Sequence, residues 1–175
     1  MKFIYSKKYF LCSSVSIIFL LCTFFHFIYQ FSHECVVIAM LAPMNESVFE
    51  HTKMIPVPLV GWWLTMFFIH KEKIKISCWL TSTLLSLLVS IGLMISLYYL
   101  YTGMFGIESL IIDIFVLFVS LLAGQWLGFH YYHHRGKSFG RMAIVCIIMV
   151  FFILAYFTFF PLNIPFFSDP ALLRK

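Results

Sequence analysis

Five apolar runs, each long enough to cross a lipid bilayer, are the feature that most constrains this chain. They cover residues 9–31, 54–70, 76–101, 108–133 and 142–160. A hydrocarbon core of about 30 Å is crossed by roughly 20 apolar residues in a helix. Lipid offers the backbone no hydrogen-bond partners, and the runs are too long and too uniformly apolar for the alternating strands of a barrel. The sequence therefore predicts an all-α, polytopic membrane helix bundle with about five transmembrane helices.

The composition leaves too little polar material for a water-soluble surface. Hydrophobic residues make up 62% of the 175 residues, and charged residues only 11%. We therefore expect residues 1–175 to form a single integral membrane domain in the cell membrane, with the lipid bilayer as its main partner. The net charge of +5 then reflects membrane topology and anionic lipid headgroups, and nucleic acid is not an expected partner.

The basic residues predict how the chain crosses the membrane, because cytoplasmic loops are enriched in Lys and Arg. If the N-terminus is inside, three basic residues lie outside: Lys53, Arg174 and Lys175. All the others lie inside: Lys2, Lys7, Lys8, Lys71, Lys73, Lys75, Arg135, Lys137 and Arg141. We therefore expect the N-terminus inside, the C-terminus outside and residues 161–175 as an extracytoplasmic tail. The acidic residues sort to the outer side, except Glu72.

Three smaller features predict local structure. Residues 32–46 form an interfacial or re-entrant loop, because the stretch 33–42 is too short to span the membrane and too apolar for a free loop. Pro56 and Pro58 remove backbone donors and predict a kink or local unwinding early in the second run. Small residues one turn apart in the fourth run predict close helix packing, beside an amide suited to an interhelical hydrogen bond: Gly124, Gly128 and Gln125.

A dense polar cluster lies between the first two runs, at Asn45-Glu46-Ser47-Val48-Phe49-Glu50-His51. Ionisable side chains at this depth are costly and therefore need partners. His26 lies about five residues, or roughly 7 Å of helix, before the outer end of the first run, and Asp113 lies equally far into the fourth. If the second helix begins at Ser47 and continues to about residue 70, both side chains should lie at the same depth in the membrane as Glu50 and His51.

Imidazoles and carboxylates delivered by three helices are a ligand set for a divalent metal such as zinc. Two structural explanations stay open. Ser47 and Glu50 have the spacing of a capping box, with Lys53 one turn beyond Glu50. The box leaves three side chains unexplained, for which a purely structural polar network is the alternative: His26, His51 and Asp113.

Several segments together resemble one family. They are residues 45–53, the His26-Phe27-Ile28-Tyr29 segment, Tyr101-Thr102-Gly103 followed by Asp113-Ile114, and the ending 157–170. They resemble a family of small bacterial integral membrane proteins of unknown function with an N-E-S-x-W-E-H-x-K signature. Phe49 stands where that family usually has Trp, and Leu162 where a second proline is usual. The resemblance implies a fold and a location more than a reaction.

Two classes of function fit the polar cluster. In the first, a divalent metal bound by His26, His51, Asp113 and one of Glu46 or Glu50 activates water against an ester or amide of a lipid-like substrate. Glu50 or Glu46 is then the general base. The supporting residues are Asn45, Ser47 and Lys53.

In the second class, the same cluster binds a cation, a proton or another small-molecule ligand for transport or sensing, or belongs to a membrane interaction or immunity protein. A transporter needs a polar path to both faces, whereas the acids here stop in the outer half of the spans. This one-sided distribution favours the hydrolase hypothesis over a transporter, and it equally suits a receptor or a partner-binding site. The sequence leaves the oligomeric state open.

Overall fold

The computed structural model describes residues 7–134 and 137–168, and within them every regular element is a helix. Five helices are long and apolar enough to cross a membrane: Tyr9–Phe31, Val48–Ile69, Ile76–Phe105, Leu110–His133 and Gly140–Phe159. The all-helical prediction is confirmed at this level. Five charged residues used in the topology prediction lie outside the described part: Lys2, Arg135, Asp169, Arg174 and Lys175.

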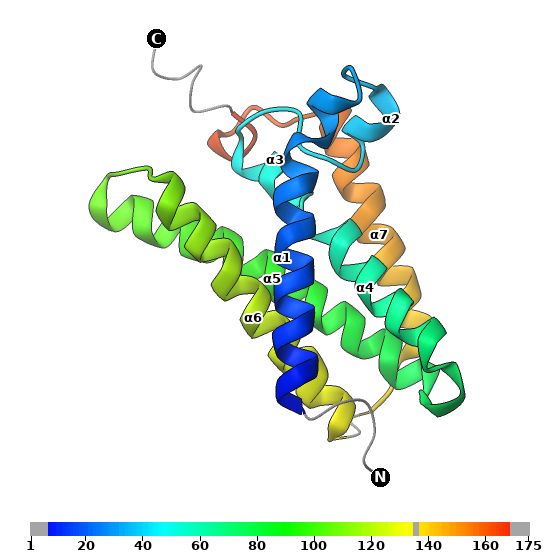
Figure 1. The fold of residues 1–175 in the computed structure, drawn as a ribbon. Coiled ribbons are helices and arrows are strands. Elements are labelled where there is room, and N and C mark those ends of the chain that lie inside the picture. Colours follow the sequence, from blue (N-terminus) through cyan, green and yellow to red (C-terminus); the bar gives the residue numbers. More distant parts are fainter. Residues whose placement is uncertain (1–6, 135–136, 169–175) are drawn as a thin grey trace.

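Within the described residues, seven α-helices and two short 3-10 helices follow one another (Figure 1). The α-helices are α1 (Lys7–Phe31), α2 (Val36–Ala39), α3 (Val48–Thr52), α4 (Pro56–Ile69), α5 (Ile76–Phe105), α6 (Leu110–His133) and α7 (Gly140–Phe159). The 3-10 helices are η1 (Lys71–Lys73) and η2 (Pro165–Phe167). The four-residue helix α2 lies within the predicted interfacial segment 32–46, at the same end of the bundle as α3.

The second apolar run is interrupted, because α3 ends at Thr52 and α4 begins at Pro56. Proline lacks a backbone N–H and fits the first turn of a helix, where that donor has no partner within the helix. The break predicted from the two prolines is therefore present, in place of one continuous helix over 47–70. The α-helical pattern is interrupted, but the chain stays coiled: the backbone N–H groups of Lys53, Met54 and Ile55 donate to carbonyl oxygens three residues back at 3.0, 3.2 and 3.4 Å, so tight turns join α3 to α4.

Helices α5 and α6 pack closely along small residues. A Cβ atom built on Gly128 would lie 2.8 Å from the carbonyl oxygen of Ser82 and 2.9 Å from Cβ of Ser86. One built on Gly124 would lie 2.7 Å from the carbonyl oxygen of Ser86. Only glycine permits this approach, as the spacing of the two glycines predicts.

Gln125 joins three helices within this packed interior. Its Oε1 accepts a hydrogen bond from Nε1 of Trp63 on α4 at 3.1 Å, and its Nε2 donates to Oγ of Ser86 on α5 at 2.8 Å. The Nε1–H of Trp79 donates in turn to the backbone oxygen of Trp63 at 2.9 Å. Buried polar groups need such partners in an apolar interior. The interhelical role predicted for Gln125 is confirmed.

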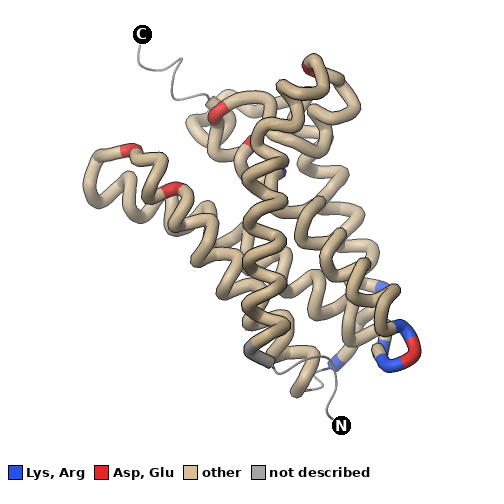
Figure 2. The backbone as a smooth tube through the Cα atoms, in the orientation of Figure 1, with Lys and Arg blue, Asp and Glu red and all other residues tan. Residues whose placement is uncertain are grey.

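The charged residues separate toward the two ends of the bundle (Figure 2). Basic residues mark η1 and the segment that joins α6 to α7, with one acidic residue, Glu72, in η1. Acidic residues mark the loops between α1 and α3, α3 itself and the outer part of the α5–α6 hairpin, with the basic Lys53 at the end of α3. We refer to these as the basic end and the acidic end. The separation is the one on which the topology prediction depends, and the orientation in the membrane stays a prediction.

The α5–α6 hairpin lies obliquely to the other long helices, and its connecting end stands apart from α1 and α3 (Figure 1). Helix α5 has 30 residues and is therefore about 45 Å long, more than the hydrocarbon core of about 30 Å. Tilting is the usual response of such a long helix to the bilayer. The outer part of the hairpin exposes large apolar side chains, with Leu110 74% and Ile111 80% exposed.

The glycine packing gives a first prediction. Gly128→Ala should destabilise the protein by about 1–3 kcal/mol, because the new methyl group collides with α5 backbone. Gly92→Ala is the matched control, since a Cβ there meets no atom within 4 Å and alanine is the better helix former by about 1 kcal/mol. Unfolding midpoints in detergent measure both. Equal stabilities of the two variants would contradict the packing.

Candidate metal centre

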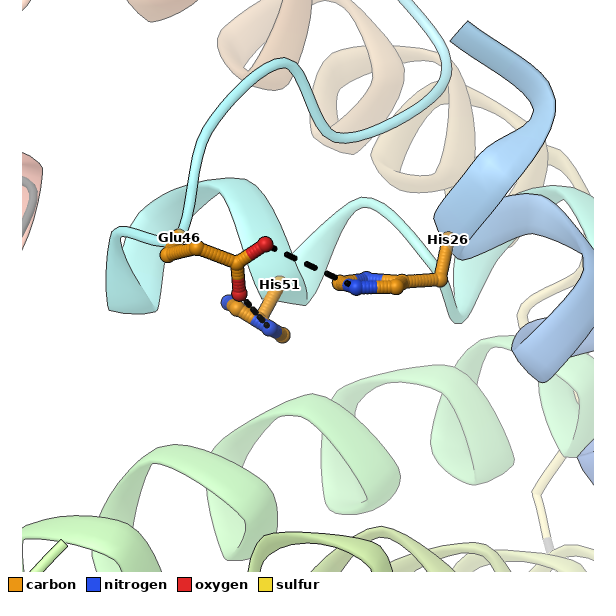
Figure 3. Close-up of side chains that lie close together, drawn as sticks. All are labelled: His26, Glu46 and His51. Carbon is orange, nitrogen blue, oxygen red and sulfur yellow. Dashed lines mark ion pairs between the residues drawn. The ribbon is translucent and has the colours of Figure 1, made fainter. Parts of the chain in front are cut away.

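Three side chains from separate segments converge at the acidic end (Figure 3). His26 comes from α1, Glu46 from the loop before α3, and His51 from α3 itself. Nε2 of His26 lies 3.6 Å from Oε1 of Glu46, and Nε2 of His51 lies 3.4 Å from Oε2 of the same carboxylate. One ligand atom from each residue can be chosen so that all three lie within 4.8 Å of one another.

These distances suit a tetrahedral ion. Zinc bonds to imidazole nitrogen and carboxylate oxygen are about 2.0–2.2 Å long, so neighbouring ligand atoms on a zinc tetrahedron are about 3.3–3.5 Å apart. The two nitrogen-to-oxygen distances, 3.6 and 3.4 Å, are close to that edge and run to different oxygens of Glu46, so an ion placed between the rings would face both carboxylate oxygens. Three protein ligands would leave the fourth position open, as in catalytic rather than structural zinc sites.

The hydrogen bond made by the other ring nitrogen of His51 fixes its tautomer. Nδ1 lies 2.9 Å from the backbone oxygen of Ser47. A carbonyl oxygen only accepts hydrogen bonds, so Nδ1 carries the hydrogen and, in the neutral ring, Nε2 presents a lone pair to Glu46. A lone pair facing a carboxylate requires a proton or a cation between them. A backbone carbonyl on the second ring nitrogen is also the usual support of a metal-binding histidine.

His26 is held differently. Its ring packs against Phe27 edge-on, with ring centroids 4.8 Å apart, and its centroid lies 5.3 Å from that of His51. Nδ1 of His26 is buried and has no hydrogen-bond partner among the described residues. Packing, rather than a hydrogen bond to Nδ1, therefore orients this ring.

Glu50, the other glutamate of the motif, has a structural position. It is buried, and its Oε2 lies 2.5 Å from Nζ of Lys53 and accepts the backbone N–H of Met44 at 2.8 Å. Its own backbone N–H donates to Oγ of Ser47 at 3.3 Å, so Ser47 is the N-cap of α3 as predicted. The Ser47 backbone N–H donates instead to Oδ1 of Asn45 at 2.9 Å. The capping box is thus half formed.

Lys53 links three segments from within the protein. Besides Glu50, its Nζ donates to the backbone oxygen of Ala39 on α2 at 2.7 Å and to Oγ1 of Thr158 on α7 at 3.0 Å. Phe49 adds an apolar contact on α3 by packing against the C-terminal segment, at ring centroids 4.5 Å from Phe167. Sequence reasoning missed Ala39 and Thr158, because no local pattern relates them to Lys53.

Asp113 is not one of the three clustered side chains. It accepts a hydrogen bond from the hydroxyl of Tyr101 at 2.5 Å, joining α6 to α5. Its carboxylate also interacts electrostatically with His51 and with Glu108. The structure therefore places Asp113 beside the cluster, on the hairpin. Tyr101 could be found from the sequence only through the segment that carries the family resemblance.

The different positions of the two glutamates give a second prediction. Glu50→Ala should destabilise the protein by about 3–5 kcal/mol, because it leaves the Lys53 ammonium buried without a counter-charge. Glu46→Ala should change stability by less than about 0.5 kcal/mol, because that side chain is 60% exposed. Thermal unfolding of metal-free protein in detergent measures both. A larger loss in Glu46→Ala than in Glu50→Ala would reverse the assignment.

Comparisons with known proteins identify a family and no reaction. No curated protein and no solved structure matches the chain. The sequence model of a family described as "Family of unknown function (DUF6512)" matches residues 1–173. The signature and the bacterial origin implied by the resemblance stay predictions. Since the match extends over nearly the whole chain, this membrane-like helical protein belongs to the DUF6512 family.

Proposed function

We propose that this protein is a membrane-embedded hydrolase that depends on a divalent metal, such as zinc, bound by His26, Glu46 and His51. The observation that carries the proposal is one carboxylate facing two imidazole Nε2 atoms at 3.4 and 3.6 Å. The lone pair that a neutral His51 would present to Glu46 leaves room for a proton or a cation at this point, and we assign a metal cation. Two imidazoles and a carboxylate form a ligand set typical of zinc.

The open fourth position suits water activation. A bound divalent ion makes water nucleophilic at neutral pH and polarises the carbonyl that the water attacks. Glu46 is here a ligand, and Glu50 already has Lys53 and Met44 as partners. We therefore assign proton acceptance to Asp113, predicted from the sequence as a metal ligand, with Tyr101 holding its carboxylate. A general base needs this kind of orienting partner.

The surroundings of the cluster favour a lipid-like substrate. The acidic end would lie at the outer surface of the cell membrane, with the N-terminus inside and the C-terminus outside. The carboxylate of Glu46 is accessible, and Asp113 belongs to the same hairpin as the exposed Leu110 and Ile111. We propose that an ester or amide of a lipid approaches the cluster from the bilayer, with its acyl chain among these exposed apolar side chains.

Elemental analysis of detergent-purified protein tests metal binding. The wild type should retain close to one divalent ion per chain, whereas His26→Ala, His51→Ala and Glu46→Gln should each lose it. His33→Ala is the matched control, because this exposed histidine of the same end lies outside the cluster. Absence of metal from the wild type, even after reconstitution with excess zinc, would contradict the proposal.

A panel of lipid esters and amides tests the reaction separately. Zinc-loaded wild type should turn over at least one of them, and His51→Ala should be inactive. Asp113→Asn should keep the metal but lose activity by about 100-fold or more, the usual contribution of a general base. Activity that persists in His51→Ala would exclude the metal mechanism. Metal loss in Asp113→Asn would return Asp113 to the ligand set.

A proton-binding site is the second candidate, because an imidazolium fits the same Nε2-to-carboxylate distances as a metal-bound imidazole. Such a site would serve sensing or transport rather than hydrolysis. The two candidates respond oppositely to acid: lowering the pH releases a metal, since its ligands must be deprotonated, whereas it loads a proton site. Metal-free wild type that changes conformation on acidification, with no change in His51→Ala, would favour this second candidate.

A further inference from the structure

Lys53 is a buried cation that the proposed chemistry does not use. Its side chain is 1% exposed, and an ammonium group has three N–H donors and no acceptor. Three acceptors lie within hydrogen-bond distance: Oε2 of Glu50 at 2.5 Å, the oxygen of Ala39 at 2.7 Å and Oγ1 of Thr158 at 3.0 Å. Every donor is engaged and the side chain is closed to a substrate. Lys53 therefore has a structural role: it holds α2, α3 and α7 together.

The contacts of the Lys53–Glu50 pair fall on the loop that carries Glu46. Lys53 holds the loop where it leaves α2, through Ala39. Glu50 holds it two residues before Glu46, by accepting the N–H of Met44 at 2.8 Å. Asn45 accepts the N–H of Ser47 at 2.9 Å and so bridges Glu46 itself. The backbone is therefore fixed on both sides of a residue whose side chain is 60% exposed.

Glu46 differs from the two histidines in needing this support. His26 and His51 belong to helices, whose backbone hydrogen bonds fix the direction of each side chain. Glu46 belongs to a loop, and its side chain makes contact with the two imidazoles at 3.4 and 3.6 Å. Without a fixed loop, the entropy of ordering this long side chain would oppose each binding event.

We propose that Lys53 and Glu50 are positioning residues for Glu46: their buried charge pair holds the loop 39–46 so that the Glu46 carboxylate stands between the two imidazoles. This inference rests on the proposed metal site and adds to it a preorganised carboxylate ligand. The pair touches no ligand atom of the site, so its effect passes through the backbone of the loop. Partners of this kind typically change metal affinity by 10- to 100-fold.

Zinc affinity measured by competition with a chromophoric chelator in detergent tests the proposal. The double variant Glu50→Gln/Lys53→Met removes both charges and leaves none buried without a partner. Zinc should bind it at least about tenfold more weakly than the wild type. Made in a Glu46→Gln protein, the same double change should cause little further loss, because a positioning pair has no effect once the carboxylate it positions is removed. A merely structural role would give additive losses.

Gln125→Met is the matched control. Gln125 is as deeply buried and joins helices in the bundle interior, so its loss should lower stability and leave zinc affinity unchanged. If the double variant does not fold, Lys53→Arg replaces it, since a planar guanidinium cannot present the same three donors. We expect the same loss of zinc affinity from Lys53→Arg. Unchanged affinity, or losses that add to that of Glu46→Gln, would overturn the positioning role and leave the metal site intact.

Failure of the metal site itself is recognised by a wild type that binds no zinc. Amide hydrogen exchange in the metal-free proteins then decides the positioning role. Faster exchange across 39–47 in the double variant than in Gln125→Met would support it, because the oxygen of Ala39 would lose its donor and the N–H of Met44 would face an amide oxygen in place of a carboxylate. Exchange equal to that of the control would overturn it.

Discussion

A lysine buried in an apolar protein imposes a strict condition on the structure around it. Its charge must be opposed and each of its three donors must find an acceptor, because an unpaired charge in such surroundings costs several kcal/mol. Lys53 meets this condition with a carboxylate from α3, a backbone carbonyl from α2 and a hydroxyl from α7. The arrangement of three segments at the acidic end therefore depends on one ammonium group.

The polar motif divides into two sets because of helical geometry. Residues four apart on a helix share a face, whereas neighbours are turned by about 100°. Glu50 faces the interior with Lys53, and its neighbour His51 faces outward toward Glu46 and His26. Helix α3 is a single turn that precedes the break at Pro56; its inward face is held by the Lys53–Glu50 pair, and its outward face presents an imidazole. One short segment thus supplies both an anchor and a candidate ligand.

The positions of the long helices could be predicted from the sequence, whereas the course of the loop over residues 32–46 could not. Apolar runs locate the long helices because, in lipid, each run must satisfy its backbone hydrogen bonds internally. The effects of Gly124 and Gly128 on packing and of Pro56 on the helix break are also local, so they too could be predicted. The choice between Glu46 and Glu50 as the carboxylate near His51 depends on the course of residues 32–46, for which no periodicity exists. Contacts such as Lys53 with Thr158 join residues 105 positions apart, beyond the reach of local patterns.

The same distinction explains why depth alone did not bring Asp113 into the cluster. Equal depth places two side chains at one level of the membrane, but it does not set the direction in which each faces or the distance between the helices. The hairpin of α5 and α6 is oblique, and its connecting end stands apart from α1 and α3 (Figure 1). Asp113 finds a nearer partner in Tyr101 on the adjoining helix. The tilt of the hairpin follows from the length of α5 and from packing at Gly124 and Gly128. Because of this tilt, Asp113 lies beside the three clustered side chains and not among them.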